Sequence, residues 1–397
     1  MKHALEACSV SLPRNQPRCG VCTSKLVKNG KTSAGRTRWR CKHCGASTTK
    51  SRTDITRKAE FDAFQHWLAG TQAQGGYTIP RRTFRHRIRW CWNVAPALTP
   101  TGEVHDQIML DGTYFNGWCV LIAFTGRHVI NWQYTDAEKR ASWTALLEHI
   151  PAPKAAIVDG NGPLQTIVKK HWPTTRIQRC FFHIRQRGNT HLTRNPTLPA
   201  NKELLALYKA LMDVRALDKA AAWTAAFASW EAKWQSFLKH RTYAEKSTIR
   251  PAHVSPNQQW WYTHIRTRRA WKLLANLIRD DELFTWLKLA EDGVIISRTT
   301  NPLEGGPNKA IKDFLRAHRG LSAPHAVTAI TWLLYHRTEH PKDAWQFVKP
   351  TDWAEPNKRR IPPRTDTGRS ETNALYGTSF SVEDGTGIRK GWGGRSG

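Results

Sequence analysis

Two stretches of the sequence decide the fold: Ile108-Met109-Leu110-Asp111-Gly112-Thr113-Tyr114 and Ala155-Ala156-Ile157-Val158-Asp159-Gly160-Asn161-Gly162. Each is an apolar run that ends in an aspartate and a glycine, as expected of a buried β-strand followed by a turn. The residues between them predict a hairpin over Trp118 to Tyr134 and a helix over Ala141 to Ile150. Because strands of one sheet that each end in an acid bring those acids to one edge, we expect Asp111 and Asp159 to lie side by side.

Two carboxylates held this close repel each other unless a divalent cation lies between them. Magnesium prefers oxygen ligands and is often bound by one or two protein carboxylates, with phosphates and water completing its coordination. The pair therefore predicts a metal-assisted centre for phosphodiester chemistry. For either stretch alone, the alternative is that Asp-Gly is a common turn dipeptide after a strand.

The composition indicates a folded protein with a polyanionic partner. The chain has 397 residues, of which 40% are hydrophobic, and its 61 Lys and Arg against 31 Asp and Glu leave a formal charge of +30. This composition excludes a disordered or collagen-like chain. The charge favours a nucleic acid as the partner, with a membrane surface as the competing polyanion.

Membrane insertion and secretion are not expected. The longest apolar run, Trp118 to Phe124, is far shorter than the roughly 20 residues of a membrane-spanning helix. The residues from Met1 to Cys8 lack the continuous apolar stretch of a secretory signal. We therefore expect a cytoplasmic protein that associates with the nucleoid and has no membrane partner.

Four of the eight cysteines form two CxxC pairs that eighteen residues separate: Cys19 with Cys22, and Cys41 with Cys44. This spacing is typical of a zinc ribbon, in which four thiolates hold one structural Zn²⁺ ion. The residues between the pairs are rich in Lys and Arg, and Arg38, Trp39 and Arg40 are expected to contact DNA phosphates. The alternative is a Zn²⁺ ion that only stabilises a small subdomain.

A helix-turn-helix is expected after the zinc ribbon. Apolar residues recur at helical spacing within Lys58 to Leu68, and a break at Gly70 to Gly76 precedes a second helix over Arg81 to Trp92. The buried stripe of this second helix is expected to be Phe84, Ile88 and Cys91. Four arginines then face outward, as a recognition helix requires: Arg81, Arg82, Arg85 and Arg89. The alternative is a solvated basic helix.

We expect six segments along the chain. They are a zinc ribbon with a flexible start at 1–53, a helix-turn-helix domain at 54–100, the first part of an α/β core at 105–199, an all-helical block at 200–290, the closing part of the core at 291–349, and a flexible basic tail at 350–397. The closing part is expected to hold a short strand at Gly293 to Ile296 and helices at about Asn308 to Arg319 and about His325 to His336.

The sequence resembles the Mutator-like transposases of bacterial insertion sequences. The resemblance covers roughly residues 105–340 and rests on four features: Asp111 in LDGTY, Asp159 in VDGNG, Cys180-Phe-Phe-His183, and Glu304 in TTNPLEGGPNKAIK. It implies an RNase H-like mixed-sheet core, with the helical block at 200–290 as an all-α insertion. It also implies that Asp111, Asp159 and Glu304 form a DDE triad that holds two Mg²⁺ ions, with Mn²⁺ as a substitute.

Glu304 and the Cys180/His183 pair each allow another interpretation. Asn301 to Glu304 is also a helix-capping sequence, but Gly305-Gly306-Pro307 is expected to break such a helix, so we place Glu304 in the approach to a helix that starts at Pro307. Cys180 and His183 are expected on or just past a strand over Arg176 to Phe182. The resemblance implies an active-site role for this pair. The alternatives are a buried thiol beside a lone histidine, or half of a second zinc site, for which no second pair is found.

These features together predict a DNA transposase. It would bind the terminal inverted repeats of its element and a target duplex, and use Mg²⁺ to cleave and transfer strands, acting as at least a homodimer because two DNA ends must be held together. One alternative is a non-catalytic DNA-binding regulator with the same zinc ribbon and helix-turn-helix, or an inactive transposase relative. A structure-specific nuclease is a further alternative, which the two N-terminal modules argue against.

Overall fold

The computed structural model describes residues 17–19, 21–49, 53–70, 79–99, 101–251 and 254–354. The chain divides into two compact units. The first unit consists of Met1–Thr99 and Pro307–Pro362, and the second of Pro100–Gly306 and Pro363–Gly397. No helix among the described residues is long and apolar enough to cross a membrane. The expected break at Gly70 to Gly76, apart from Gly70 itself, lies outside the described residues, as do most of the basic tail and the start of the chain.

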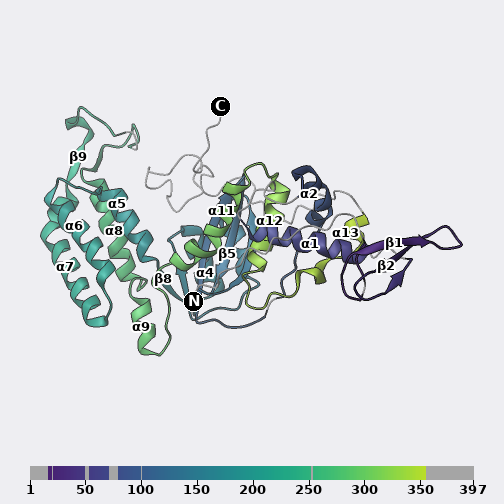
Figure 1. Ribbon diagram of the computed structural model, residues 1–397. Helices are drawn as coiled ribbons and strands as arrows, with labels where there is room; N and C mark the ends of the chain where they lie inside the picture. Colours follow the sequence, from purple (N-terminus) through teal and green to yellow (C-terminus); the bar gives the residue numbers. More distant parts are fainter. Residues whose placement is uncertain are drawn as a thin grey trace. The chain divides into compact units, whose positions relative to one another are not determined.

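A five-stranded mixed sheet forms the centre of the second unit (Figure 1). Its strands are β4 (Gln107–Phe115), β5 (Trp118–Phe124), β6 (Val129–Thr135), β7 (Ala155–Val158) and β8 (Arg176–Arg179), in the order β6-β5-β4-β7-β8. β4, β5 and β6 pair antiparallel, whereas β4 with β7 and β7 with β8 pair parallel. The predicted strands at 108–114 and 155–158 and the predicted hairpin are therefore confirmed.

Two helices supply the parallel crossovers and cover one face of this sheet. α3 (Arg140–Leu147) precedes β7, and α4 (Gly162–His171) connects β7 to β8. Alternate residues of β4, among them Ile108 and Leu110, share a buried core with Trp143 of α3 and Leu164 of α4. The period-two alternation of β4 thus places its other residues, including Asp111, on the opposite side of the strand.

The block after β8 is mainly helical and has its own core. Its helices are α5 (Phe181–Leu192), α6 (Pro199–Ala210), α7 (Leu217–Lys239), α8 (Ile265–Arg279) and α9 (Thr285–Glu291). Figure 1 shows α6, α7 and α8 running alongside one another, and their shared core includes Tyr208, Trp223, Phe227, Trp230 and Leu274. The expectation of an all-helical block is wrong in one detail, because β9 (Arg241–Tyr243) pairs antiparallel with β10 (Trp260–Tyr262).

Two further expectations for this unit are corrected. The strand predicted over Arg176 to Phe182 ends at Arg179, and α5 begins at Phe181, so His183 lies on a helix. The short strand predicted at Gly293 to Ile296 is not formed within the described residues, although Ile296 is buried against Ala155 and Leu289. The apolar run there packs as an extended segment without a ladder of strand hydrogen bonds.

The first unit combines helices from both parts of the chain. These are α1 (Thr53–Ala69), α2 (Arg81–Arg87) with a 3₁₀ turn at Arg89–Asn93, α11 (Lys309–Ala317), α12 (Ala323–Tyr335), a 3₁₀ turn at Ala344–Phe347, and α13 (Pro350–Ala354). The aromatic rings of Phe61, Trp90 and Trp332 pack together, and Trp67 meets Phe84 edge to face with ring centroids 6.2 Å apart. The tail expected from residue 350 therefore begins with a short helix.

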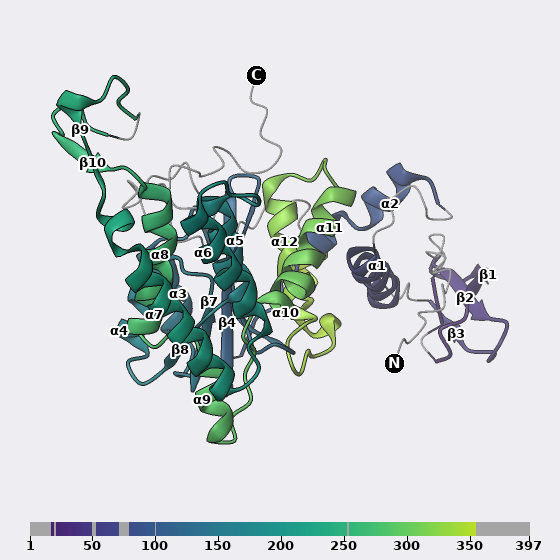
Figure 2. The ribbon, with the colours of Figure 1, turned by 90° about the vertical axis from the view of Figure 1, so that its left-hand side faces the viewer.

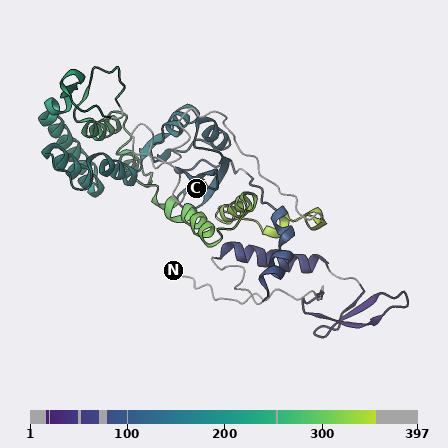
Figure 3. The same cartoon turned by 90° about the horizontal axis from the view of Figure 1, so that it is seen from above.

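A small sheet lies at the start of the first unit. β1 (Leu26–Lys31) and β2 (Thr37–Cys41) form an antiparallel hairpin, drawn in purple in Figure 3, and β2 also pairs with β3 (Ser47–Thr48). Its core is small and consists of Leu26 with the buried cysteines Cys19 and Cys41. A core of this size is too small to hold a fold by burial alone.

Candidate active site and cysteine cluster

Asp111 and Asp159 occupy matching positions on neighbouring strands, as predicted. The parallel register pairs Met109 of β4 with Ile157 of β7, and each acid lies two residues beyond that pair. Figure 2 shows β4 and β7 side by side in the sheet. Asp159 is buried, at 6% exposed, and Asp111 is half-buried. β7 ends at Val158, directly before Asp159. β4, by contrast, continues through Asp111 to Phe115, so the turn predicted after Asp111 is not formed. The sheet therefore presents two carboxylates on neighbouring strands, with little water around them.

The turn after β7 fixes Asp159. The backbone N–H of Asn161 donates a 2.8 Å hydrogen bond to Asp159 Oδ1, and the side-chain oxygen of Asn161 accepts from the N–H of Leu164 to cap α4. Gly160, between Asp159 and Asn161, has a φ of +108°. A Cβ built on Gly160 would lie 1.7 Å from Nη2 of Arg179. Glycine is thus required here by both the backbone conformation and the guanidinium beside it.

Glu304 lies on a continuous helical stretch rather than in an approach to one. α10 (Asn301–Leu303) leads into a π-helical turn at Glu304–Asn308 and then into α11. The sequence prediction that Gly305-Gly306-Pro307 would break the helix is wrong, because the wider π turn accommodates Pro307 without the usual clash. Thr300 precedes this stretch, and its hydroxyl donates a 2.7 Å hydrogen bond to Glu304 Oε1.

Cys180 and His183 face Glu304. Cys180 is the last residue before α5, and His183 is in the first turn of that helix. The Cys180 sulfur accepts a 3.3 Å hydrogen bond from the backbone N–H of Thr300, and the Thr300 hydroxyl oxygen also lies 3.3 Å from this sulfur. His183 Nε2 lies 3.7 Å from Glu304 Oε1, whereas its Nδ1 is buried without a hydrogen-bond partner among the described residues.

Sequence reasoning missed one acid of this site, Glu138. It lies between β6 and α3, where its Oε2 accepts a 3.0 Å hydrogen bond from the Asn161 side-chain amide. A Cβ built on Gly112, the residue after Asp111, would lie 2.6 Å from Glu138 Oε1. The only signal in the sequence was an acidic residue shortly before the helix predicted over Ala141 to Ile150, which is common in proteins without any site.

The charges of these groups act on one another. Burial raises the pKa of Asp111 to about 7, and the nearby charges of Asp159 and Glu304 add to that shift. Burial also raises the pKa of Glu138 well above its usual range, with further contributions from Asp159 and Asp111. For His183, burial lowers the pKa, but the interaction with Cys180 and the charges of Asp159 and Glu304 outweigh it and raise the pKa to about 9.

The donor atoms are suited to hard divalent cations. Carboxylate oxygens are the protein ligands that Mg²⁺ prefers, and the mutual repulsion of these acids is relieved when a cation binds between them. Within the described part of the chain, one group near these acids has all its donor atoms within 4.8 Å, namely Cys180, His183 and Glu304. Asp111, Asp159 and Glu304 do not form such a tight group, but two ions about 4 Å apart need ligands spread over a longer distance.

A polar cavity of about 600 Å³ lies along α5. Its lining residues are Phe182, Arg185, Gln186, Asn189, Arg194 and Lys209, which include three cations and no acid. Phe182 is 44% exposed, which is unusual for a large aromatic side chain and leaves its ring available to a ligand. The spacing of Phe182, Arg185 and Asn189 places them on one face of the helix.

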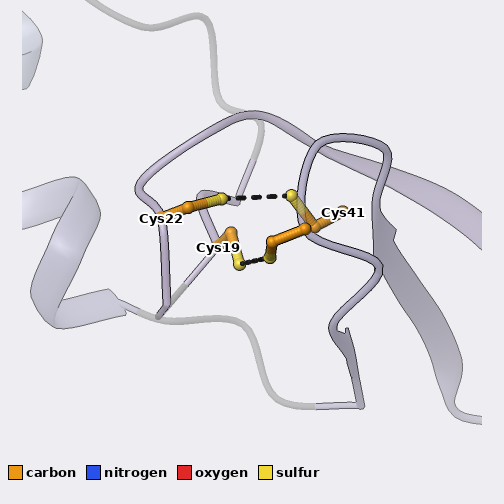
Figure 4. Close-up of side chains that lie close together, drawn as sticks. Cys19, Cys22 and Cys41 are labelled. Atoms are coloured by element: carbon orange, nitrogen blue, oxygen red, sulfur yellow. Dashed lines mark hydrogen bonds between the residues drawn. The ribbon is translucent and has the colours of Figure 1, made fainter.

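The four predicted zinc ligands come together in the first unit. Figure 4 shows Cys19, Cys22 and Cys41 pointing to a common centre, and the fourth ligand is Cys44. The sulfurs of Cys19 and Cys44 are 3.4 Å apart, as are those of Cys22 and Cys41, and all four lie within 4.8 Å of one another. Zn–S bonds of about 2.3 Å give tetrahedral edges of roughly 3.8 Å. The cluster therefore fits one zinc ion.

The two turns that carry the cysteines differ in how far they favour thiolates. The N–H of Val21 donates to the Cys19 sulfur at 3.4 Å, and hydrogen bonds from the side chain and backbone of Ser24 lower the pKa of Cys22 to about 5. Gly45, which follows Cys44, has a φ of +75° that closes the second turn. The first turn thus favours the charged form of sulfur that zinc binds, whereas on the second turn the neighbouring thiols raise the pKa of Cys44 to about 12.

The expected DNA-contacting residues are mostly on the surface. Exposed arginines lie on β2, on α2 and on the 3₁₀ turn after it: Arg38, Arg40, Arg81, Arg82, Arg85 and Arg89. Trp39 differs, because its side chain is half-buried against the cysteine cluster. The predicted stripe of Phe84, Ile88 and Cys91 is buried, although the second helix ends at Arg87 and continues as a 3₁₀ turn.

Comparison with known proteins shows a likeness to transposases over part of the chain. Residues 117–264 match the family described as Transposase, Mutator family, so this part of the chain is similar to Mutator-like transposases, in agreement with the resemblance found in the sequence. The matched segment contains Asp159, Cys180 and His183, whereas Asp111 and Glu304 lie outside it. No curated protein matches the chain.

Proposed function

We propose that the protein is a DDE transposase of an insertion sequence, which cleaves DNA at the terminal inverted repeats of its element and transfers the strands to a target duplex. The observation that carries this proposal is the matching register of Asp111 and Asp159 on neighbouring strands, with a segment similar to the Mutator transposase family spanning the second acid. Glu304 is proposed as the third acid, because its side chain meets His183 of the same site.

The core is proposed to be RNase H-like. In support, the sheet is mixed, and its neighbouring parallel strands are β4, which carries Asp111, and β7, which leads directly to Asp159. The residues of the block from α6 to α9 then form the insertion between the second and third acids. The small β9–β10 sheet is part of that insertion.

Asp111, Asp159 and Glu304 would hold two Mg²⁺ ions, or Mn²⁺ in their place. Bound metal would lower the pKa of the attacking water or 3′-hydroxyl and stabilise charge on the attacking and leaving oxygens. The protein's own residues orient these acids: Asn161 donates to Asp159, and Thr300 donates to Glu304. Cys180 fixes Thr300 by accepting its N–H, so Cys180 and His183 are proposed to position Glu304.

The DNA contacts are proposed to come from several basic surfaces. The Arg38 and Arg40 side chains on β2 and the arginines of α2 would bind phosphates and base edges of the terminal repeats. The cavity beside α5 would bind the DNA strand that leads into the active site, with Arg185, Arg194 and Lys209 at phosphates and Phe182 stacked on a base. One Zn²⁺ ion on the four cysteines would keep the β1–β2 hairpin folded. Two DNA ends held together imply at least a homodimer.

A gel assay separates this proposal from a DNA-binding regulator. Labelled duplexes from the flanks of the gene are incubated with purified protein, with Mg²⁺ present or omitted, since a chelator would also remove zinc. A transposase cleaves and joins strands only when Mg²⁺ is present. Binding that is equal in both conditions, with no cleavage, would instead assign a regulator or an inactive transposase relative.

A further inference from the structure

Glu138 is tied to Asp159 through a single residue. The side-chain amide of Asn161 donates to Glu138 Oε2 at 3.0 Å, and the backbone N–H of the same residue donates to Asp159 Oδ1 at 2.8 Å. Because the Asn161 side-chain oxygen caps α4, the asparagine cannot rotate without losing that cap. The separation of the two carboxylates is therefore fixed by one rigid turn.

Glu138 is also seated directly on the strand that carries Asp111. Its Oε1 occupies the space that a side chain at Gly112 would need, since a Cβ there would lie 2.6 Å away. The backbone N–H of Glu138 donates a 3.0 Å hydrogen bond to the hydroxyl of Tyr114, on the same strand. These contacts hold the carboxylate against the strand that carries Asp111, and Asn161 links it to the turn that carries Asp159.

Glu138 has no ion-pair partner in the described part of the chain, although the charge of His183 acts on it from a distance. Among the described residues, no Lys, Arg or His forms an ion pair with it, and the adjacent Lys139 pairs with Asp136 at 3.0 Å instead. Glu282, a buried acid of the same unit, shows the usual arrangement: Lys169 lies 2.7 Å from its carboxylate and Arg179 lies 3.6 Å away. Keeping a buried carboxylate charged among other acids, without an ion-pair partner, costs free energy unless a cation binds from outside the chain.

We propose that Glu138 is a fourth carboxylate of the metal-binding site, acting beside Asp111, Asp159 and Glu304. The proposal rests on the function proposed above, because it assigns a further ligand to the same ions. It also explains two neighbouring residues. Gly112 leaves room for the Glu138 carboxylate, and Asn161 holds that carboxylate at a fixed place relative to Asp159.

Metal affinity tests the proposal without any DNA reaction. The zinc-loaded full chain is titrated with Mn²⁺, and free Mn²⁺ is measured by electron paramagnetic resonance. Glu138→Gln keeps an oxygen that accepts from Asn161 but removes the charge, and it is expected to weaken Mn²⁺ binding at least tenfold. Glu148→Gln is the matched control, since Glu148 flanks the other end of α3 and is exposed; its affinity should stay within twofold of the wild type.

Gly112→Ala provides a second variant that leaves every acid in place. Its methyl group must displace the Glu138 carboxylate, so Mn²⁺ binding should weaken as it does in Glu138→Gln. Both changes act on the same carboxylate, so their effects should not add. The double variant should therefore bind Mn²⁺ at least as tightly as the single variant with the lower affinity. Circular dichroism confirms that each variant is folded.

The outcomes separate this proposal from the one it rests on. If Asp159→Asn weakens Mn²⁺ binding and Glu138→Gln does not, Glu138 is not a ligand and the three-acid site stands. If neither variant changes Mn²⁺ binding, the metal site itself is wrong and both proposals fail. Weakening by both variants, with Glu148→Gln unchanged, is the expected result.

Discussion

The hydroxyl of Thr300 lies 2.7 Å from Oε1 of Glu304, and Thr300 is fully buried. The same residue donates to the sulfur of Cys180, so one threonine connects the third acid to the residue before α5. Asn301, which the alternative interpretation made a helix cap, is instead the first residue of α10, and Thr300 precedes it. The orientation of Glu304 thus depends on a side chain four residues before it.

Thr300→Val tests that dependence. Valine has nearly the same volume but cannot donate a hydrogen bond, so we expect a loss of about 1 kcal/mol in the free energy of unfolding and a fall of tenfold or more in DNA cleavage. Urea unfolding and a single-turnover cleavage assay measure the two effects. Thr300→Ser restores the hydroxyl and should recover most of the cleavage rate. Equal cleavage by the wild type and Thr300→Val would show that Glu304 needs no such support.

Gly160→Ala is expected to destabilise the second unit. The added Cβ would have to displace the Arg179 guanidinium and adopt a φ of +108°, which together cost about 1–3 kcal/mol. Gly162→Ala is the control, because a Cβ at Gly162 meets nothing within 4 Å. Urea unfolding of both variants should separate them clearly. Similar midpoints for the two variants would contradict the strained turn.

The sequence predicts the positions of Asp111 and Asp159 better than it predicts which residues surround them. Asp111 and Asp159 follow strongly apolar runs, and period-two strands in parallel order bring them together, as the register of β4 and β7 shows. Glu138 carries no such pattern, because only the fold brings the residue after β6 against Gly112. Its contact partners are 26 and 23 residues away in the chain, so no local rule links them.

Local sequence patterns predict the wrong backbone conformation at two places. Gly305-Gly306-Pro307 normally ends a helix, yet here the chain passes through a π turn into α11. Phe181 and Phe182 read as the end of a strand, but α5 starts at Phe181, whose ring is buried in the core shared with the helical block. In both places the backbone expected from the sequence is wrong.

Zinc content tests the cysteine cluster. The wild type should contain one Zn²⁺ per chain by atomic absorption, and Cys22→Ser should contain much less, since three thiolates and one hydroxyl bind zinc far more weakly. Cys91→Ala changes a buried cysteine outside the cluster and should keep its zinc. Zinc-free wild-type protein that still folds its β1–β2 hairpin would contradict a structural role for the metal.

The cavity beside α5 should contribute to DNA affinity through its charges. A variant with both Arg185→Ala and Arg194→Ala removes two proposed phosphate contacts, so the slope of log affinity against log salt should become smaller by about 2. Lys219→Ala with Lys239→Ala removes two exposed lysines of α7 as a control and should leave the slope unchanged. Fluorescence anisotropy with a labelled duplex provides both slopes. The same slope for both double variants would exclude this cavity from the DNA path.

The most direct measurement compares strand cleavage and joining by the wild type and Asp159→Asn on duplexes that carry the ends of the element, in Mg²⁺. Asp106→Asn, which alters an exposed acid paired with Lys154 just before β4, is the control. The account predicts that all three proteins bind the duplex equally, and that the wild type and Asp106→Asn cleave and join it while Asp159→Asn does neither. Full cleavage by Asp159→Asn would contradict a reaction centred on the paired aspartates.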